Sequence, residues 1–410
     1  MTGDPIVITG MGCVTPVGLD VQSTWKSLLE GQSGVGPIQR FDAQQYPVQF
    51  AAEVPNFEVL VPENCSEFTR KQLQTLKGKL AYKAALEAMT QSRLTVHGPR
   101  FGVSLGSEAA RPEIDLIAKR FQDESLPSVA ELRHHAPQAP AQMLAEVFGA
   151  EGPVSVVSTA CTSSSQAVGE GLLRLRRGDL DAMLVGGVDV LVDPLMVTGF
   201  ALLGALSTRN DAPQGASRPF DSERNGFVLG EGAGMLVLET LQHAQQRGAQ
   251  IIGVLRGYGC SCNAYRITDS PPDGRGAAQS MQSALLDAGL KPSDIGYINA
   301  HGTSTLMNDA SESKGIHWAF GSHATSVYVS STKSMMGHLV AACGAVEAII
   351  ALMAARTGRL PPTINLNQPD VECNLKHVQN HAVAHSFNHA LTNAFGFGGS
   401  NGSLVLSRWA

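Results

Sequence analysis

The stretch Val154-Ser-Val-Val-Ser-Thr159 is a short apolar strand, and Ala160-Cys161-Thr-Ser-Ser-Ser165 after it opens a helical segment of small side chains. The same order recurs at Val327-Tyr-Val-Ser-Ser-Thr332, which also precedes a segment of small residues. The two helical segments end near Arg177-Gly178 and near Gly358, where glycine favours the end of a helix. The chain therefore contains one strand–helix unit twice.

Further segments repeat in the same order along the chain. They pair Ile6–Gly12 with Ile251–Gly259, the helix Ala84–Met89 with the helix Ala284–Ala288, and the strand Phe101–Leu105 with the strand Gly296–Ala300. Chance likeness among short apolar strings is the alternative, and several repeats in one order count against it. We predict two halves of like topology, residues 1–249 and 250–410. Alternating strands and helices of this kind indicate an α/β sandwich with helices between sheets.

Length and charge limit the classes of function. The chain has 410 residues, of which 43% are hydrophobic and 16% charged, so it can bury a large core. Its net charge is −6 and no basic run stands out, which argues against nucleic-acid binding. Residues 35–75 are irregular and rich in Pro, Gln and aromatic residues, and we expect them to be an insertion. We expect residues 110–140 to be a second insertion, mostly helical and polar.

Cysteine usage and apolar runs indicate where the protein works. The seven cysteines are odd in number and irregularly spaced, which favours a reduced, cytoplasmic setting over a disulfide framework. Cys260-Ser-Cys262 has no second cysteine pair nearby, so we expect no zinc site. We see neither a signal peptide nor a run of eighteen apolar residues, and we expect no membrane segment.

Cys161 follows the first repeated strand and precedes its helix. Unsatisfied N–H groups and the helix dipole at such a position favour thiolate over thiol, and the same N–H groups can hold an oxyanion. The alternative is a small buried core cysteine, which is the commoner fate of a free cysteine. Position alone does not exclude this alternative.

Two histidines favour catalysis. His301 lies in Asn299-Ala-His301-Gly-Thr303-Ser-Thr305, directly after an apolar strand, and His338 follows the second repeated strand. A pseudo-twofold axis between the halves would bring Cys161 and His338 to one point. A lone histidine is usually a structural imidazole, but the equivalent positions in the repeat favour a shared site.

These segments resemble the condensing-enzyme branch of the thiolase superfamily, specifically the β-ketoacyl-acyl-carrier-protein synthases of type II. Three more motifs carry the resemblance: Arg218-Pro-Phe-Asp-Ser-Glu-Arg-Asn-Gly-Phe-Val-Leu-Gly-Glu-Gly-Ala-Gly234, Leu360-Pro-Pro-Thr-Ile-Asn365 and Asn393-Ala-Phe-Gly-Phe-Gly-Gly-Ser-Asn401. Motifs of this length in one order across nearly the whole chain are specific. The resemblance implies a thiolase-like, five-layered sandwich and an acyltransferase.

The resemblance also implies the roles of the central residues. Cys161 would take an acyl group from a carrier-bound thioester. The N–H groups of Cys161 and Phe397 would form the oxyanion hole. His301 and His338 would hold the malonyl thioester carbonyl while carbon dioxide leaves, and the resulting carbanion would attack acyl-Cys161. The chain would grow by two carbons, in fatty-acid synthesis or in specialised polyketide or aryl-polyene synthesis.

Supporting residues are implied in the same way. Lys333 matches a catalytic lysine near His338, and Glu312 matches its carboxylate partner. Phe395 and Phe397 belong to a glycine-rich loop, with Phe397 as the gate. The phosphopantetheine arm would be bound by Thr268, Thr303 and Thr305.

The resemblance implies an acyl carrier protein as partner and no cofactor beyond its phosphopantetheine. We expect the carrier to dock on cations that include Arg70, Lys71, Lys119 and Arg120, near which Lys77 and Lys79 add charge. An ordinary solvated helix face is the alternative. We also expect a homodimer, or a heterodimer with a chain-length factor, paired through the strand Val154–Thr159.

Several positions depart from the family pattern. Gln166, Asn263 and Arg266 stand where fatty-acid enzymes usually have His, Asp and His. Gly204 replaces a carrier-binding arginine, and Glu108 and Ala109 replace Gly and a larger aliphatic residue near the acyl pocket. These departures point to a specialised pathway.

Three rival classes fit less well. A thiolase needs a second cysteine in the loop that here reads Phe395-Gly-Phe-Gly-Gly-Ser. A chain-initiating synthase would have Asn where His338 stands. A non-catalytic chain-length factor would lack Cys161.

Overall fold

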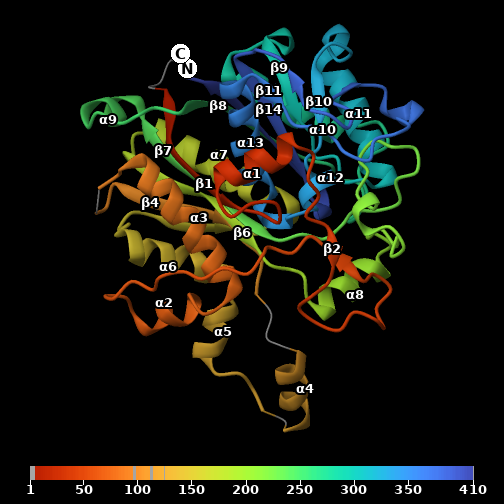
Figure 1. Cartoon of the computed structure of the whole chain (residues 1–410). Coiled ribbons are helices and arrows are strands. Elements are labelled where there is room, and N and C mark those ends of the chain that lie inside the picture. The colour runs from red at the N-terminus through yellow and green to blue at the C-terminus, as the bar shows by residue number, and fades with distance from the viewer. Residues whose placement is uncertain (1–4, 96–97, 111–113, 124, 410) are drawn as a thin grey trace.

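The computed structural model describes residues 5–95, 98–110, 114–123 and 125–409 (Figure 1). Eleven strands in this part form one sheet, whose order is β12-β10-β9-β14-β15-β8-β1-β7-β6-β4-β5. The α/β class predicted from the repeats is confirmed. The sheet is continuous because β1 (Ile6–Val14) pairs antiparallel with β8 (Gly253–Cys262) at the junction of the two halves.

Each half contributes one run of the sheet. The first run contains β1, β4 (Phe101–Gly106), β5 (Val154–Val157), β6 (Ala182–Asp189) and β7 (Gly232–Thr240). The second contains β8, β9 (Ile295–Asn299), β10 (Tyr328–Ser330), β14 (His389–Phe395), β15 (Ser400–Arg408) and the added β12 (Lys376–His377). Three strands of the first run are parallel, as are four of the second including β12, and the two nearest the junction pair antiparallel in both runs. We retain residues 1–249 and 250–410 as the proposed halves.

Helices follow the same repeat. Outer helix α3 (Leu76–Ser92) packs on β1 and β7, and α10 (Arg275–Ala288) packs on β8 and β15. Helices α7 (Ser163–Arg176) and α13 (Cys343–Thr357) pack against each other and against strands of both halves (Figure 1). The central pair therefore lies inside the protein, where the small residues of both segments allow close contact.

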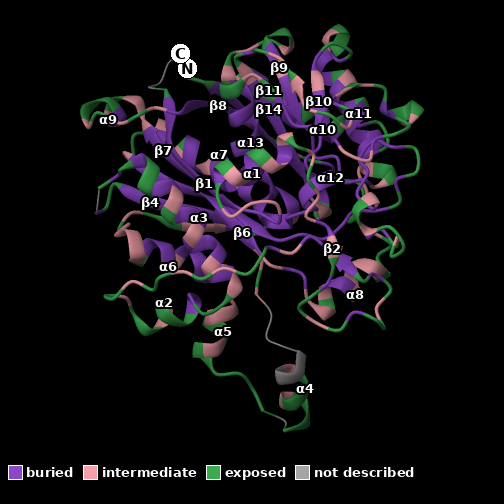
Figure 2. Cartoon of the chain, viewed as in Figure 1, coloured by how far each residue is buried: buried purple, intermediate pink, exposed green. Residues whose placement is uncertain are grey.

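The approach of α7 and α13 requires glycine at their contact. A Cβ added to Gly344 would lie 2.0 Å from the Ser165 Oγ atom, and the Ser164 hydroxyl accepts a bond from the Ala345 N–H at 3.0 Å. Val340–Thr357 is apolar and long enough to cross a membrane, but 89% of it is buried within the fold (Figure 2). Its apolar character therefore has a sufficient explanation in core packing.

Nine further α-helices and two small sheets complete the described part of the chain. The helices are α1 (Val21–Leu29), α2 (Glu67–Gln72), α4 (Ile114–Gln122), α5 (Val129–His135), α6 (Ala139–Phe148), α8 (Pro194–Leu202), α9 (Leu241–Gln246), α11 (Leu306–Phe320) and α12 (Lys333–Met336). Two small sheets pair β2 (Gly36–Pro37) with β3 (Phe50–Ala51) and β11 (Arg359–Leu360) with β13 (Val383–Ala384).

The second insertion forms an arm that extends away from the body (Figure 1). It is helical as predicted, but its surface is less polar than expected. Phe121, Leu126 and Val129 expose more than four fifths of their surface. The described part of the arm therefore exposes apolar as well as polar side chains.

Candidate active site

The chain turns sharply between β5 and α7. The strand ends at Val157, two residues earlier than predicted, because the backbone bends towards Ala160. Ala160 adopts a left-handed conformation with φ of 53°, which non-glycine residues rarely take. Cys161 follows in the short helix η1 (Ala160–Thr162), and only 6% of its surface is exposed. The strained turn thus holds the sulfur at the start of a central helix.

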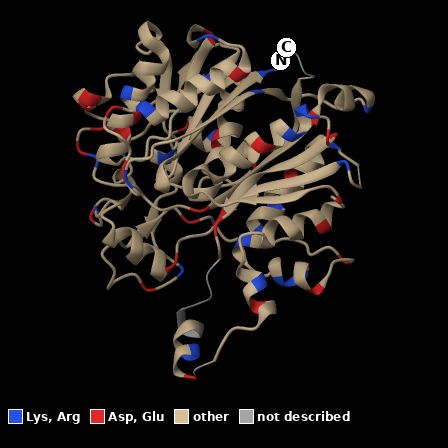
Figure 3. Cartoon of the chain, turned by 180° about the vertical axis from the view of Figure 1, so that it is seen from behind, with Lys and Arg blue, Asp and Glu red and all other residues tan. Residues whose placement is uncertain are grey.

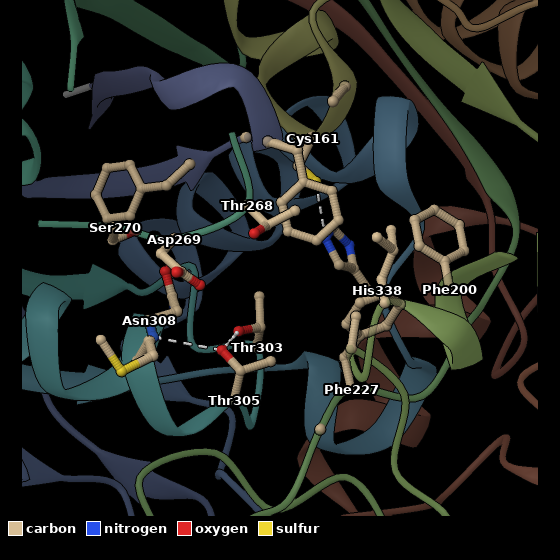
Figure 4. Close-up of a pocket in the computed structure, with 18 of the residues that line it drawn as sticks. Cys161, Phe200, Phe227, Thr268, Asp269, Ser270, Thr303, Thr305, Asn308 and His338 are labelled. Carbon is tan, nitrogen blue, oxygen red and sulfur yellow. Dashed lines mark hydrogen bonds between the residues drawn. The ribbon is translucent and has the colours of Figure 1, made fainter. Parts of the chain in front are cut away.

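His338 lies against this sulfur. Its Nε2 atom is 3.0 Å from the Cys161 Sγ atom (Figure 4). The Val340 N–H donates to Nδ1 at 3.2 Å, and the His338 N–H donates to the Val228 carbonyl at 2.7 Å. Because Nδ1 accepts a hydrogen bond, the neutral imidazole carries its own proton on Nε2, which faces the sulfur.

A second thiol contacts the other side of the same ring. The Sγ atom of Cys343 lies 3.0 Å from His338 Nδ1, and the residue is fully buried. Burial raises the pKa of the Cys343 thiol well above its usual range, so the S–H can donate to Nδ1. Sequence reasoning missed this residue. The spacing of five residues between His338 and Cys343 was the available signal, but it becomes meaningful only once the intervening turn is known.

His301 completes the cluster from the end of β9. Its ring centre lies 5.3 Å from that of His338 and 5.6 Å from that of Phe395. The N–H groups of His301 and Gly302 donate to the two carboxylate oxygens of Glu312 at 2.9 and 2.8 Å. The Nδ1 atom of His301 finds no partner among the described residues. Glu312 therefore fixes the backbone that carries the imidazole.

The expected pairing of Lys333 with Glu312 is wrong. The ammonium group of Lys333 pairs with Glu347 of α13, and both side chains are buried. The oxygens of Glu312 instead accept the backbone donors of the His301 turn and the side chain of Asn393 at 3.1 Å. Burial raises the pKa of Glu312 to about 7 and that of Glu347 to about 7.

The pKa of the Cys161 thiol depends on burial as well as on its position at a helix end. Burial raises the pKa of Cys161 to about 12, although the charge of Lys333 and hydrogen bonds from the N–H groups of Phe397 and Cys161 lower it. Burial thus opposes the thiolate that the helix end, Lys333 and these N–H groups favour. Burial and the charge of Lys333 also hold the pKa values of His301 and His338 well below their usual range. Both imidazoles are neutral near pH 7 and can donate hydrogen bonds.

The same three residues also satisfy the spacing of a metal site. One donor atom each from Cys161, His301 and His338 lies within 4.8 Å of the others. The charge of Lys333 acts on all three residues and opposes a cation there. The electrostatics therefore favour an anionic intermediate at this point.

The glycine-rich loop that contains Phe395 and Phe397 lies against the nucleophile turn. Gly396 approaches so closely that a Cβ atom would lie 2.9 Å from the Thr159 carbonyl oxygen and 3.3 Å from the Cys161 nitrogen. This contact brings the Phe397 N–H to the sulfur. The Phe397 ring lies 6.3 Å from that of Phe200 and lines the same cavity. Two N–H groups thus meet where an oxyanion would form.

A cavity of about 300 Å³ leads to Cys161 and both histidines. Thr268, Thr303 and Thr305 line it, and the hydroxyls of the last two lie 2.8 Å apart (Figure 4). Its lining also contains four exposed apolar side chains, namely Leu203, Ile267, Leu306 and Met307. We call these four residues the apolar rim. Gly204, one of the departures from the family pattern, lies beside them.

The proposed docking cations lie elsewhere. Arg70 and Lys71 are exposed on α2, and Lys71 pairs with Glu67 at 2.9 Å. Lys119 is exposed on α4, where Arg120 pairs with Glu131. None of the four predicted cations lines the described cavity. Basic and acidic side chains are interspersed in this region, as Figure 3 shows from behind.

One of the supposed surface cations is not on the surface. Lys77 exposes only 6% of its surface and lies 3.4 Å from Asp189, so the expectation that it adds to a docking patch is wrong. The Lys79 side chain is more exposed than that of Lys77, and it pairs with Glu58 at 2.9 Å. Buried lysine is rare without a specific partner, which makes Lys77 a structural element.

Two of the family departures support the loop over Cys161. The Gln166 amide donates to Ser400 at 2.7 Å, and Asn263 accepts a bond from Asn401 at 2.8 Å. Arg266 is exposed and pairs with Asp269 at 3.2 Å, at the mouth of the cavity. Gln166, Asn263 and Arg266 therefore help to hold the loop and the mouth, and the central cluster is complete.

Comparisons with known proteins agree with this geometry. The chain matches the model of the β-ketoacyl synthase N-terminal domain over residues 3–244 and that of the C-terminal domain over residues 252–367. It is 39% identical to a 3-oxoacyl-[acyl-carrier-protein] synthase 2 of Synechocystis sp. and 41% identical to one of Coxiella burnetii. Each match covers 98% of this chain and 98% of the relative.

Solved structures give the same result. A β-ketoacyl synthase from Burkholderia phymatum superposes with a TM-score of 0.89 at 32% identity, over 99% of this chain and 100% of the other. The ketosynthase complex AntDE:AntF, which contains a type II polyketide acyl-carrier protein, gives 0.88 at 31% identity over the whole of both chains. These likenesses confirm the predicted thiolase-like fold. Taken with the family models, they show that the chain belongs to the β-ketoacyl synthase family.

Proposed function

We propose that this protein is a β-ketoacyl-acyl-carrier-protein synthase that condenses a malonyl unit with an acyl chain on Cys161. One observation carries the proposal: the Cys161 sulfur lies 3.0 Å from His338 Nε2, at the inner end of a cavity that His301 also lines. A nucleophile and two neutral hydrogen-bond donors at one point suit acyl transfer followed by decarboxylation.

The first half-reaction loads the enzyme. The Cys161 sulfur attacks the carbonyl of an acyl thioester, and the N–H groups of Cys161 and Phe397 stabilise the tetrahedral oxyanion. The bond to the pantetheine sulfur breaks, and the proton of the Cys161 thiol ends on that sulfur. Because burial raises the pKa of the Cys161 thiol, the charge of Lys333 and these N–H groups matter most while the thiolate exists.

The second half-reaction forms the carbon–carbon bond. His301 and His338 donate hydrogen bonds to the thioester oxygen of the malonyl group. Carbon dioxide leaves, and its bonding electrons pass into an enolate whose negative oxygen these donors stabilise. The enolate carbon attacks acyl-Cys161, the carbon–sulfur bond breaks, and the released thiolate takes a proton from solvent. The product is a β-ketoacyl thioester that is longer by two carbons.

The substrate arm enters through the cavity. Thr303 and Thr305 form a hydroxyl pair on one wall, and Thr268 adds a third hydroxyl from a neighbouring segment. Hydroxyls at this depth fit the amides of a pantetheine arm. We assign these three threonines to the arm, which is the cofactor-like part of the substrate, and we assign no other cofactor.

The partner is an acyl carrier protein. We assign Arg70, Lys71, Lys119 and Arg120 to its electrostatic guidance, and the apolar rim to the contact around the mouth. Reversing charge with Arg70→Glu and Lys71→Glu should raise the KM for a carrier-bound thioester about threefold to tenfold, and added salt should reduce the difference. Turnover of a small pantetheine thioester is the control. Equal behaviour with both substrates would place docking elsewhere.

We also propose a dimer through the edge of the sheet. β5 is the last strand of the order, and Val154 exposes 42% of its surface there. The projecting arm, which exposes Phe121, Leu126 and Val129, belongs to the same half of the chain as β5. An ishigamide ketosynthase/chain length factor and a ketosynthase (ApeO) with its chain length factor (ApeC) are among the solved structures similar to this chain, so the partner is a second copy or such a factor.

The pathway is fatty-acid synthesis or a specialised polyketide or aryl-polyene synthesis, in the cytoplasm, where the thiol stays reduced. The reading as a non-catalytic chain-length factor is opposed by the placement of Cys161 against His338. The deciding experiment measures intact mass after incubation with acyl thioesters of the carrier protein. The mass should rise by one acyl group in the wild type and stay constant in Cys161→Ala. A chain that never gains an acyl group would overturn the proposal.

A further inference from the structure

A carboxylate lies directly behind the nucleophile turn. Glu108 follows β4, and its Oε1 atom accepts the Ala160 N–H at 3.0 Å and the Ser163 hydroxyl at 3.3 Å. Its Oε2 atom accepts the Ser158 hydroxyl at 2.7 Å. All three donors belong to the segment 158–163, which contains Cys161. One side chain therefore binds the nucleophile turn from both sides of the sulfur.

The turn needs such a support. Ala160 has φ of 53°, and residues other than glycine stay in this region only where the surroundings hold them. The Ala160 N–H that Glu108 binds belongs to the residue before Cys161, whose own N–H forms part of the oxyanion hole. A small rotation of this turn would move both the sulfur and one oxyanion donor.

Glu108 is itself fixed by buried charge. The Lys77 ammonium donates to the Glu108 carbonyl and lies 3.4 Å from Asp189. Asp189 in turn accepts the Ala341 N–H at 3.2 Å. Ala341 belongs to the turn that follows His338 in the second half. A chain of polar contacts therefore runs beneath the site and joins the Cys161 turn to the His338 turn.

We infer that Glu108 is a positioning residue for Cys161, and that Lys77 and Asp189 extend this support to the turn behind His338. The inference rests on the proposed function, because it assigns Cys161 as the acyl acceptor. The sequence pattern placed Glu108 at the acyl pocket. In the structure its carboxylate is turned to the nucleophile turn, and it does not line the described cavity.

The conservative substitution separates geometry from charge. In Glu108→Gln the amide oxygen can still accept the Ala160 N–H, and the amide nitrogen can donate to the Ser158 hydroxyl, which can reverse its role. Glu108→Ala removes all three contacts. We expect acylation of Cys161 by a small acyl pantetheine thioester to slow about tenfold or more in Glu108→Ala, because misplaced groups lose rate steeply. It should stay within about threefold of wild type in Glu108→Gln.

Two further measurements exclude a merely structural role. Decarboxylation of a malonyl pantetheine thioester depends on the histidines and should fall less than acylation in Glu108→Ala. The matched control is Glu146→Ala, since Glu146 accepts hydroxyl bonds from Ser66 and Thr69 at 2.7 Å far from the site. Glu146→Ala should acylate as the wild type does, even if its melting temperature falls as in Glu108→Ala.

Each outcome of these measurements supports or overturns the positioning role of Glu108. Acylation that falls equally in Glu108→Gln and Glu108→Ala would assign the effect to charge and overturn positioning. Wild-type acylation in Glu108→Ala, or equal loss in Glu146→Ala, would also overturn it. A wild-type chain that is never acylated would instead refute the proposed function, so the two failures are distinguishable.

Discussion

The turn that carries Cys161 and the turn behind His338 are the same structure in the two halves. Each begins with a left-handed residue, Ala160 with φ of 53° and Val340 with φ of 47°. Each continues as a short 3-10 helix, η1 or η5 (Val340–Ala342), and leads into a central helix. In this alignment Cys161 corresponds to Ala341. The repeat therefore supplies two equal helix starts, of which one carries the nucleophile.

The difference lies in what precedes the turn. The chain runs from the end of β5 at Val157 to Ala160 in three residues. In the second half it runs from Ser330 to Val340 through the extra helix α12, which carries Lys333, and then His338. This longer path places a cation and an imidazole above the partner turn. The comparison teaches that the fold brings two helix ends together, and that the longer connection in the second half adds Lys333 and His338 to the nucleophile of the first half.

The largest expected effect removes the nucleophile. Cys161→Ala makes the first turn equal to the second, where Ala341 shows that a methyl group fits. Condensation should disappear while the melting temperature changes little. The measurement is product formation from acyl and malonyl carrier thioesters, with circular dichroism as the control for folding. Elongation at the wild-type rate would refute the role of Cys161.

The next effect removes the donors that the second half supplies. His301→Ala and His338→Ala should each slow malonyl decarboxylation about a hundredfold, the usual cost of one lost oxyanion donor. Acylation of Cys161 should survive in at least one variant, because the oxyanion N–H groups come from the first turn and the loop. Parallel loss of both half-reactions in both variants would contradict this division.

A smaller effect is expected when the charge of Lys333, on α12, is removed. The charge of Lys333 helps to hold the pKa values of His301 and His338 low, so both rings stay neutral as pH falls towards 6. Removing this charge should raise both histidine pKa values, and the acid limb of decarboxylation should move to higher pH. The rate at pH 6 relative to pH 8 should fall several-fold, an effect of the order of one pKa unit or less.

The variant must remove both charges of the pair. Lys333→Met alone leaves Glu347 buried without its cation, so the test uses Lys333→Met with Glu347→Gln. Lys79→Met, which removes a cation near the surface, is the control and should leave the pH profile unchanged. A double variant with the wild-type acid limb would show that burial alone sets the histidine pKa values.

The sequence allowed the repeat, the α/β class and the Cys161–His301–His338 cluster to be predicted, because apolar strands followed by small-residue helices are local signals. It did not reveal the partner of Lys333. Glu312 follows the His301 motif and Glu347 follows the His338 motif, so the sequence offers two acidic partners for Lys333. Only the fold, which places α12 beside Glu347 of α13, decides between them. Lys77 was misassigned for a similar reason, since a lysine among surface cations shows its burial only when Asp189 is placed beside it.

The smallest expected effect tests the first residue of each central helix. Ser163 begins α7, and its hydroxyl donates to the Ala160 carbonyl at 2.6 Å and lies 3.3 Å from a Glu108 carboxylate oxygen. Cys343 begins α13, and its thiol faces His338 Nδ1 instead. Since the Val340 N–H also donates to Nδ1, Cys343 is one of two groups that keep the His338 proton on Nε2. Its loss should therefore weaken the preference for this tautomer without abolishing it.

We expect Cys343→Ala to slow decarboxylation about twofold to fivefold, below the usual effect of a whole hydrogen-bond donor because the second donor remains. Cys343→Ser keeps a hydroxyl donor and should restore most of the rate. Nitrogen NMR of labelled His338 reads the tautomer directly, and in Cys343→Ala it should show more proton on Nδ1. If the alanine variant keeps both the wild-type rate and the wild-type tautomer, the Val340 N–H alone suffices. The two central helices would then begin with side chains of which only Ser163 supports the site.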